Sequence, residues 1–293
     1  MNRLSLCVGV VVALAASSCA QTPEQATPMA ASSASAVAPT NPYVAARSWE
    51  SVLQGPWRDP KNVARDAYRH PQETLSFFGV QPNHTVIEIT PGGGWYAEIL
   101  APYLQPRGQY IAAVVDPAAV EEGRARDYQQ RGKSGLEAKF AAAPAQYGKA
   151  RIVGFDPKAP VFGAPGSANV VLTFRNVHTW RGGGTAEGMF QGFFDVLEPG
   201  GVLGVVEHRA KADVPADDKS GYVGEAQVIA MAEAAGFRLD AKSEVNANPK
   251  DTKDHPDGVW MLPPVSSHQP ADAARYNAIG ESDRMTLRFV KPQ

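Results

Sequence analysis

The chain contains few cysteines and little net charge. Its 293 residues include only Cys7 and Cys19, and 28 lysines and arginines stand against 30 aspartates and glutamates, a formal charge of −2. Both cysteines lie near the start, so removal of a leader excludes an internal disulfide or a cysteine metal site. The near-neutral charge provides no strong field for a polyanion, and nucleic acid is therefore not an expected partner.

The sequence also lacks an apolar run long enough to span a membrane. The apolar stretch from Leu4 to Ala16 follows Arg3 and precedes small residues, which is typical of an export signal. Ala16-Ser17-Ser18-Cys19 is similar to a bacterial lipobox, in which Cys19 would carry the lipid, and ordinary cleavage after Ala20 is the alternative. We therefore expect a periplasmic protein, held to a membrane by a lipid at Cys19 if the lipobox is used and without that anchor if cleavage follows Ala20.

Composition divides the rest of the chain into a linker and a folded part. Residues 20–42 are mainly Ala, Ser, Thr, Pro and Gln, and they cannot bury enough apolar surface to offset the entropy of ordering. We interpret residues 1–19 as the export signal, 20–42 as a disordered linker and 43–293 as one domain.

Apolar strands alternate with amphipathic helices along the folded part. This alternation predicts an α/β fold with a doubly wound, mostly parallel sheet of seven strands and helices on both faces. Ligands of such sheets bind beyond the carboxyl ends of the strands. The expected strands are 85–89, 109–116, 150–156, 168–174, 201–208, 238–245 and 285–291, and the expected helices 95–104, 117–140, 188–197 and 225–237.

Three consecutive glycines, Gly92 to Gly94, connect the first strand to a helix. Glycine leaves the backbone open to a bound group, and the loop amides lie at a helix start. The pattern Gly92-x-Gly94-x-x-Ala97, with Asp116 at the end of the second strand, also fits a dinucleotide site, so a nucleotide-dependent oxidoreductase is one hypothesis. Against it, the carboxylate of Glu88 before this loop would repel a pyrophosphate and favour a cationic cofactor.

These residues resemble a class I S-adenosylmethionine-dependent methyltransferase over about residues 59–292, and most closely an exported bacterial branch of predicted methyltransferases. The resemblance implies a Rossmann-like sheet whose last strand is antiparallel, with S-adenosyl-L-methionine as cofactor. The Leu197–Gly201 sequence before the fifth strand is similarly typical, whereas Thr90 stands where the family's first glycine is usual. The implied cofactor-binding residues are Glu88, Thr90, Gly92, Gly93, Gly94, Asp116, Asp156 and Arg175, although an ordinary turn at Pro157 explains Asp156 equally well.

Polar residues after the fourth and fifth strands are candidates for catalysis. Methyl transfer requires alignment of donor and acceptor, and a base if the acceptor carries a proton. Histidine titrates near neutral pH and suits that task, but a histidine that only bonds a loop is the alternative for His178. Glu207 also admits a purely structural role. The candidate catalytic residues are His178, Glu207 and His208.

Candidate substrate contacts come from two places. Asn176 and Trp180 follow the fourth strand, although a tryptophan is more often part of a core. The polar segment 246–256 is either a solvated loop or a wall over the substrate, in which Asn246, Asn248 or His255 would touch it. Similarly, the helical segment 66–73, which includes Arg69, either folds over the cofactor or only covers the sheet.

No metal site is expected, because His178, His208, Asp254 and His255 show no recognised ligand spacing.

The leading hypothesis is methyl transfer to a small-molecule acceptor. Export conflicts with a methyl donor made in the cytoplasm. Either the signal is unused, or the donor reaches the periplasm, or the fold serves as a non-catalytic ligand-binding or envelope protein.

Overall fold

Seven strands form one sheet in the computed structural model, which describes residues 45–293. The expected export signal, Cys19 and the linker lie outside the described residues. The strands are β1 Thr85–Ile89, β2 Gln109–Val115, β3 Arg151–Phe155, β4 Ala168–Phe174, β5 Leu197–His208, β6 Arg238–Ser243 and β7 Arg284–Val290.

The sheet confirms the predicted fold class. Its strand order is β3-β2-β1-β4-β5-β7-β6. β1 pairs in parallel with β2 and β4, whereas β7 runs antiparallel to β5 and β6. The direction of winding reverses between β1 and β4, so the loops after these two strands diverge and leave a crevice at their carboxyl ends.

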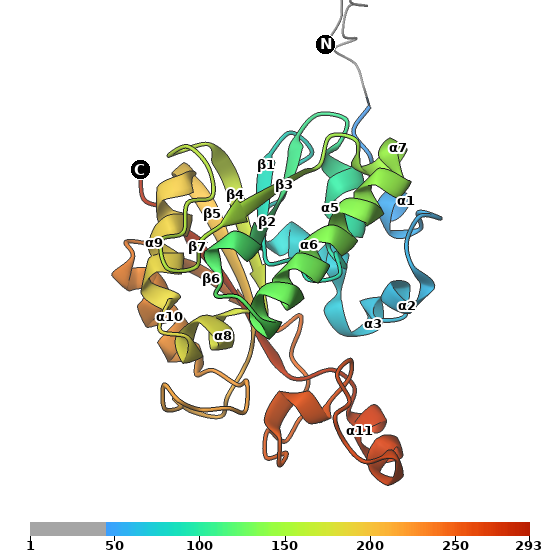
Figure 1. Ribbon diagram of the computed structural model, residues 1–293, viewed down its shortest axis with the longest axis vertical. Helices are drawn as coiled ribbons and strands as arrows, with labels where there is room; N and C mark the ends of the chain where they lie inside the picture. Colours follow the sequence, from blue (N-terminus) through green and yellow to red (C-terminus); the bar gives the residue numbers. More distant parts are fainter. Residues whose placement is uncertain (1–44) are drawn as a thin grey trace, which may run out of the picture. The chain divides into compact units, whose positions relative to one another are not determined.

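Helices cover both faces of the sheet (Figure 1). Successive strand residues point to opposite faces, so Ile87 joins the core cluster that contains Phe190 and Phe193 of α9, and Val86 joins the one that contains Ile99 of α5. The helices are α1 Trp49–Leu53, α2 Pro60–Val63, α3 Asp66–Arg69, α4 Pro71–Phe77, α5 Ala97–Leu104, α6 Arg124–Ala142, α7 Pro144–Tyr147, α8 Val177–Gly182, α9 Ala186–Val196, α10 Glu225–Ala234 and α11 Ala273–Ile279.

Some helices differ from the prediction. The helix expected over 117–140 begins only at Arg124, because the Asp116 side chain and Pro117 start a separate 3-10 turn, η1, at Pro117–Ala119. The short helices α8 and α11 are not predicted, since neither is long enough to show a clear apolar period.

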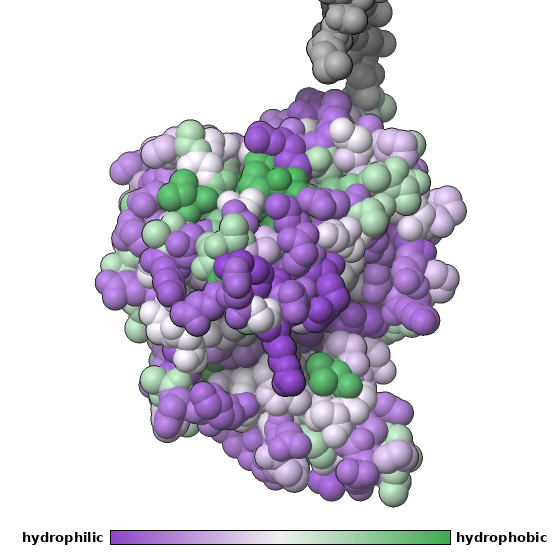
Figure 2. Space-filling model, viewed as in Figure 1, coloured by the Kyte–Doolittle hydropathy of each residue, from purple (hydrophilic) through white to green (hydrophobic). Residues whose placement is uncertain are grey.

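The segment between β6 and β7 projects from the body of the molecule and carries α11 (Figure 1). It also contains the 3-10 turns η2 Gly258–Met261 and η3 Pro270–Asp272. A small apolar cluster of Met261, Leu262 and Tyr276 holds it together. Within residues 45–293, no helix combines the length and apolar character needed to cross a membrane. The face drawn in Figure 2 is largely hydrophilic, with scattered apolar patches.

Candidate functional site

A cavity of about 610 Å³ opens at the carboxyl ends of β1, β4 and β5. This volume lies within the range of small-molecule sites. The cavity brings together residues that are far apart in the sequence and that the sequence analysis selected: Glu88, Thr90, Gly92, Gly93, Arg175, Asn176, His178, Trp180 and His208.

The glycine loop presents bare backbone to this cavity. A β-carbon added to Gly92 or Gly93 would meet no atom within 4 Å, so both positions border open space. Thr90 has a φ of 51°, the left-handed conformation that glycine adopts easily and a β-branched residue rarely does. Its buried Oγ1 has no hydrogen-bond partner among the described residues, which fits a polar ligand.

Gly94 has a different role from the two glycines before it. A β-carbon there would lie 3.0 Å from Cδ1 of Leu136 in α6, so Gly94 allows the loop and α6 to pack closely. Lys139 of the same helix donates to the Gly93 carbonyl at 3.0 Å. The loop is thus supported from the α6 side.

Glu88 lies buried at the end of β1, with 2% of its surface exposed. Tyr110 Oη donates a hydrogen bond to Glu88 Oε2 at 2.6 Å. Burial raises the pKa of Glu88 to about 7, although the bond from Tyr110 and the charge of Arg69 act in the opposite direction. Its charge at neutral pH therefore depends on what occupies the cavity, and a cation would favour the ionised form.

The two other acids implied by the resemblance cap turns. Asp116 Oδ1 accepts from the Ala118 amide at 2.9 Å, and Asp156 Oδ1 accepts from the Lys158 amide at 2.8 Å. Neither lines the cavity, although their neighbours Val115 and Pro157 do. The cofactor contacts of Asp116 and Asp156 stay predictions.

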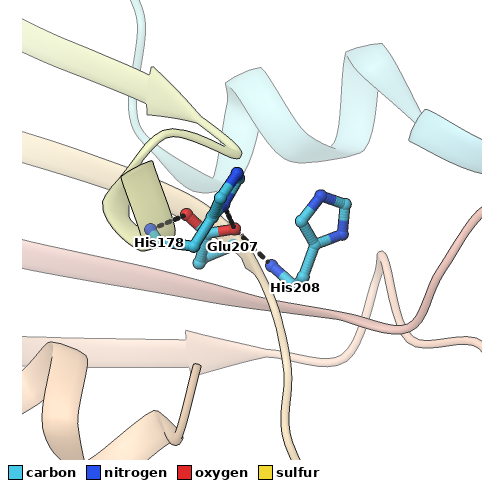
Figure 3. Close-up of side chains that lie close together, drawn as sticks. All are labelled: His178, Glu207 and His208. Atoms are coloured by element: carbon cyan, nitrogen blue, oxygen red, sulfur yellow. Dashed lines mark hydrogen bonds and ion pairs between the residues drawn. The ribbon is translucent and has the colours of Figure 1, made fainter. Parts of the chain in front are cut away.

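Glu207 organises a cluster of two histidines at the end of β5 (Figure 3). Its Oε1 accepts from the His208 amide at 2.7 Å and lies 3.1 Å from His178 Nδ1, while Oε2 accepts from the Val177 amide at 2.6 Å. A carboxylate only accepts, so this geometry places the ring proton of His178 on Nδ1. The other nitrogen, Nε2, then keeps a free lone pair.

His208 is held neutral beside this pair. Its Nδ1 lies 2.5 Å from Ser282 Oγ. Burial lowers the pKa of His208 well below its ordinary value, and the nearby His178 and Arg175 lower it further. The rings of His178 and His208 lie 5.5 Å apart, and both line the cavity.

His178, Glu207 and His208 place one potential ligand atom each within 4.8 Å of one another. Sequence spacing did not show this trio, because its members come from the ends of two different strands. Both oxygens of Glu207 already accept hydrogen bonds, and Arg175 adds a positive charge to the same cavity. The trio is therefore better arranged to orient a histidine than to bind a cation.

Further residues of the cavity wall carry no signal in their local sequence. Tyr96 and Phe174 stack with their ring centres 3.6 Å apart, and the half-exposed Trp260 lies 5.5 Å from the His178 ring. Arg65 and Arg69 reach the cavity from α3 and its N-terminal cap. Only Arg69 belongs to a segment that the sequence suggested could fold over a cofactor.

The polar segment after β6 does not supply substrate contacts to this cavity. Asn246 donates to Thr74 Oγ1 and Thr286 Oγ1, and Asn248 donates to the carbonyls of Ile279 and Glu281. His255 is buried, with Nε2 3.0 Å from Asp251 Oδ1. Asn246 thus ties the segment to α4 and β7, whereas Asn248 and His255 bond within the segment between β6 and β7, and none of the three lines the cavity.

The two candidate contacts after β4 do line it, but each is also used in the fold. Asn176 Nδ2 donates to the Ile89 carbonyl and to Thr173 Oγ1, which ties the loop after β4 to β1. Trp180 is 6% exposed and packs against Phe190 and Phe193. Their substrate contacts stay predictions.

Known structures share the fold of this chain. The StiE O-MT segment, residues 961–1257 of its parent, has a TM-score of 0.50 at 16% identity and covers 84% of this chain and 82% of its own. The chain has the fold of S-adenosylmethionine-dependent methyltransferases. A SAM-dependent methyltransferase from Aquifex aeolicus has a TM-score of 0.49 at 13% identity, with 84% of this chain and 99% of its own covered.

The methyltransferase fold alone does not decide the reaction. The (4+2) cyclase SpnF is also similar to the chain, with a TM-score of 0.51 at 14% identity over 78% of this chain and 82% of its own. Its name describes a cyclisation. No protein-family model matches the chain, and a comparison with curated proteins gives no match either. The reaction must therefore be argued from the site.

Proposed function

We propose that the protein transfers a methyl group from S-adenosylmethionine to a small-molecule acceptor. One observation carries the proposal: the bare glycine loop, the buried Glu88 and the His178–Glu207 pair all border the same cavity. The first two suit a methyl donor and the third suits removal of a proton from an acceptor. The fold places the cavity where ligands of such sheets bind.

The residues around the glycine loop fit the donor. S-adenosylmethionine, when bound, supplies a methyl group activated by a positively charged sulfur. Gly92 and Gly93 leave room for close approach, and Thr90 Oγ1 offers an unused hydrogen bond. With a pKa raised to about 7, Glu88 can lose its proton when a cation enters, and this gives a cationic ligand an advantage over a neutral one.

His178 is the proposed general base. Its contact with Glu207 Oε1 fixes the ring and places the proton on Nδ1, so Nε2 is free to take a proton from an acceptor hydroxyl or amine. The imidazolium that results is stabilised by the carboxylate of Glu207. The rings of the neutral His208 and of Trp260 each lie 5.5 Å from the His178 ring.

The test is formation of S-adenosylhomocysteine from the donor in the presence of small-molecule mixtures. We expect His178→Gln to lower the rate by about 10²- to 10⁴-fold, the usual contribution of a general base, without weakening donor binding. His84→Gln, at the opposite end of β1, is the matched control and should keep full activity. An unchanged rate in His178→Gln would contradict the role of the base. Donor binding without any turnover would favour the non-catalytic alternative.

A further inference from the structure

One wall of the cavity gathers more positive charge than the surrounding protein balances. Glu281 accepts from Arg65 Nε at 2.8 Å, from Arg69 Nε at 3.0 Å and from Arg284 Nη1 at 3.0 Å. Burial alone would raise the pKa of Glu281, but the charges of Arg69, Arg284 and Arg65 lower it to about 2. One carboxylate thus serves three guanidinium groups.

Arg175 adds a fourth positive charge. Within residues 45–293, no carboxylate comes within 4.0 Å of its guanidinium, although Arg175 lines the cavity. Its φ of 63° is a conformation that costs free energy for a residue other than glycine, and Arg175 stands two residues before α8, the helix that carries His178. Burial lowers the pKa of Arg175, although the charges of Glu281 and Glu207 act in the opposite direction.

Two of the other arginines have hydrogen-bond donors without an acceptor among the described residues. Arg65 Nη2 and Arg69 Nη2 are buried and have no hydrogen-bond partner in the described part of the chain, and both residues line the cavity. Arg69 is only 3% exposed, and burial together with the charge of Arg175 lowers its pKa to about 9. Buried cationic donors without partners are costly unless a ligand supplies acceptors.

The methyl donor cannot supply the missing negative charge. S-adenosylmethionine carries one carboxylate, one ammonium group and one sulfonium, so its net charge is positive. Ionisation of Glu88 would match that positive charge and leave the excess on the arginine wall unchanged. A second ligand with negative charge would balance the arginines, and the acceptor is the other molecule that the reaction brings.

We propose that the acceptor carries an oxyanion, a carboxylate or a phosphate, which binds Arg69 and Arg175. This inference rests on the proposed function and names the chemical class of its substrate. Guanidinium groups bind carboxylate and phosphate oxygens in pairs of parallel hydrogen bonds, so two arginines fix the orientation as well as the position of the acceptor. Because Arg175 lies just before α8, the helix that carries His178, an oxyanion at Arg175 places the rest of the acceptor beside the base.

The experiment is a calorimetric titration of the full chain with inorganic phosphate at low ionic strength and near-neutral pH, and in parallel with acetate. We expect saturable binding of at least one of the two, and their relative affinity distinguishes a phosphate-bearing from a carboxylate-bearing acceptor. Arg175→Gln should weaken that binding by roughly tenfold or more, the loss expected for a charge-assisted hydrogen bond. Arg126→Gln, which removes an arginine paired with Glu122 on the surface of α6, is the matched control and should bind like the native protein.

A second arm separates the acceptor from the donor. In the presence of saturating S-adenosylhomocysteine, the anion should still bind, because the donor's own carboxylate occupies a different place. Loss of anion binding under these conditions would assign the arginines to the donor and overturn the inference. The inference would also be overturned if neither anion bound, or if Arg175→Gln bound the anion as tightly as the native protein. Anion binding with no affinity for S-adenosylhomocysteine would overturn the proposed function and leave the oxyanion site.

Discussion

A single carboxyl group at the end of β1 controls the charge at the floor of the cavity. The sequence places Glu88 at a strand end before a glycine loop, and this position is confirmed. Its charge state could not be predicted, because it depends on Tyr110 of the neighbouring strand and on burial by both layers of the fold. A strand end is visible in a local pattern, whereas desolvation is a property of the packed molecule.

Glu88→Gln should make the protein more stable, in a way that depends on pH. In the unfolded chain the Glu88 carboxyl loses its proton near pH 4.5, and in the folded chain only near pH 7. Between these values the folded state binds more protons, so raising the pH lowers the free energy of unfolding of the native protein. Glutamine does not titrate, so the variant keeps its free energy of unfolding as the pH rises. Relative to the native protein, the free energy of unfolding of the variant should be higher by up to about 3 kcal/mol at neutral pH and equal below pH 4.5.

Denaturant unfolding of both proteins across this pH range measures the difference. A difference that does not vary with pH would contradict the raised pKa. The same variant should bind S-adenosylmethionine less tightly than the native protein, because an amide cannot ionise to meet a cation.

At the scale of elements, a substitution in the glycine loop tests whether this loop borders the bound methyl donor. Gly93 has ordinary backbone geometry and open space around its missing β-carbon, so Gly93→Val should fold normally. Its new methyl groups would occupy the cavity that Gly93 borders, and we expect at least a tenfold loss of donor affinity, roughly 1.4 kcal/mol. Gly182→Val is the matched control, since Gly182 also borders open space but does not line the cavity. Equal donor affinity in both variants would show that the loop does not face the donor.

Contacts between distant elements also hold the site together. Glu281, just before β7, binds Arg69 of α3 and Arg65 at its cap, across more than two hundred residues of sequence. Glu281→Gln removes the charge that partners the buried guanidinium groups of Arg69 and Arg284 and the partly buried one of Arg65, and it should destabilise the protein by about 3 kcal/mol. Thermal unfolding measures this, with the surface variant Glu122→Gln as control. A Tm equal to that of the control would contradict the account of this cluster.

The position of a residue in the fold decides whether its place in the site could be predicted from the sequence. Residues at strand ends, such as Arg175, His178 and His208, could be predicted because a parallel sheet gathers those ends at one edge. Arg65 and Trp260 could not, since they reach the cavity from outside the sheet, from the N-terminal cap of a four-residue helix and from a 3-10 turn. Asn246 and His255 stand out in sequence because they are polar, but their polar groups serve buried hydrogen bonds.

For the molecule as a whole, the net charge of the chain does not indicate the charge of the cavity wall. The chain carries a formal charge of −2, which gives no reason to expect a polyanion. Yet the cavity concentrates Arg65, Arg69 and Arg175 on one wall. The mostly parallel, seven-stranded sheet could be predicted from the alternation of apolar strands and helices, whereas this concentration arises only when α3 folds against the sheet.

Calorimetric titration of the full chain with S-adenosylmethionine tests the central claim most directly. The account predicts one saturable site per chain, with a dissociation constant in the range of about 1 μM to 1 mM that enzymes show for their substrates, and weaker binding in Gly93→Val. Binding of the demethylated product, S-adenosylhomocysteine, at the same site is also expected. No heat with either compound at millimolar concentration would contradict the claim that this cavity holds a methyl donor.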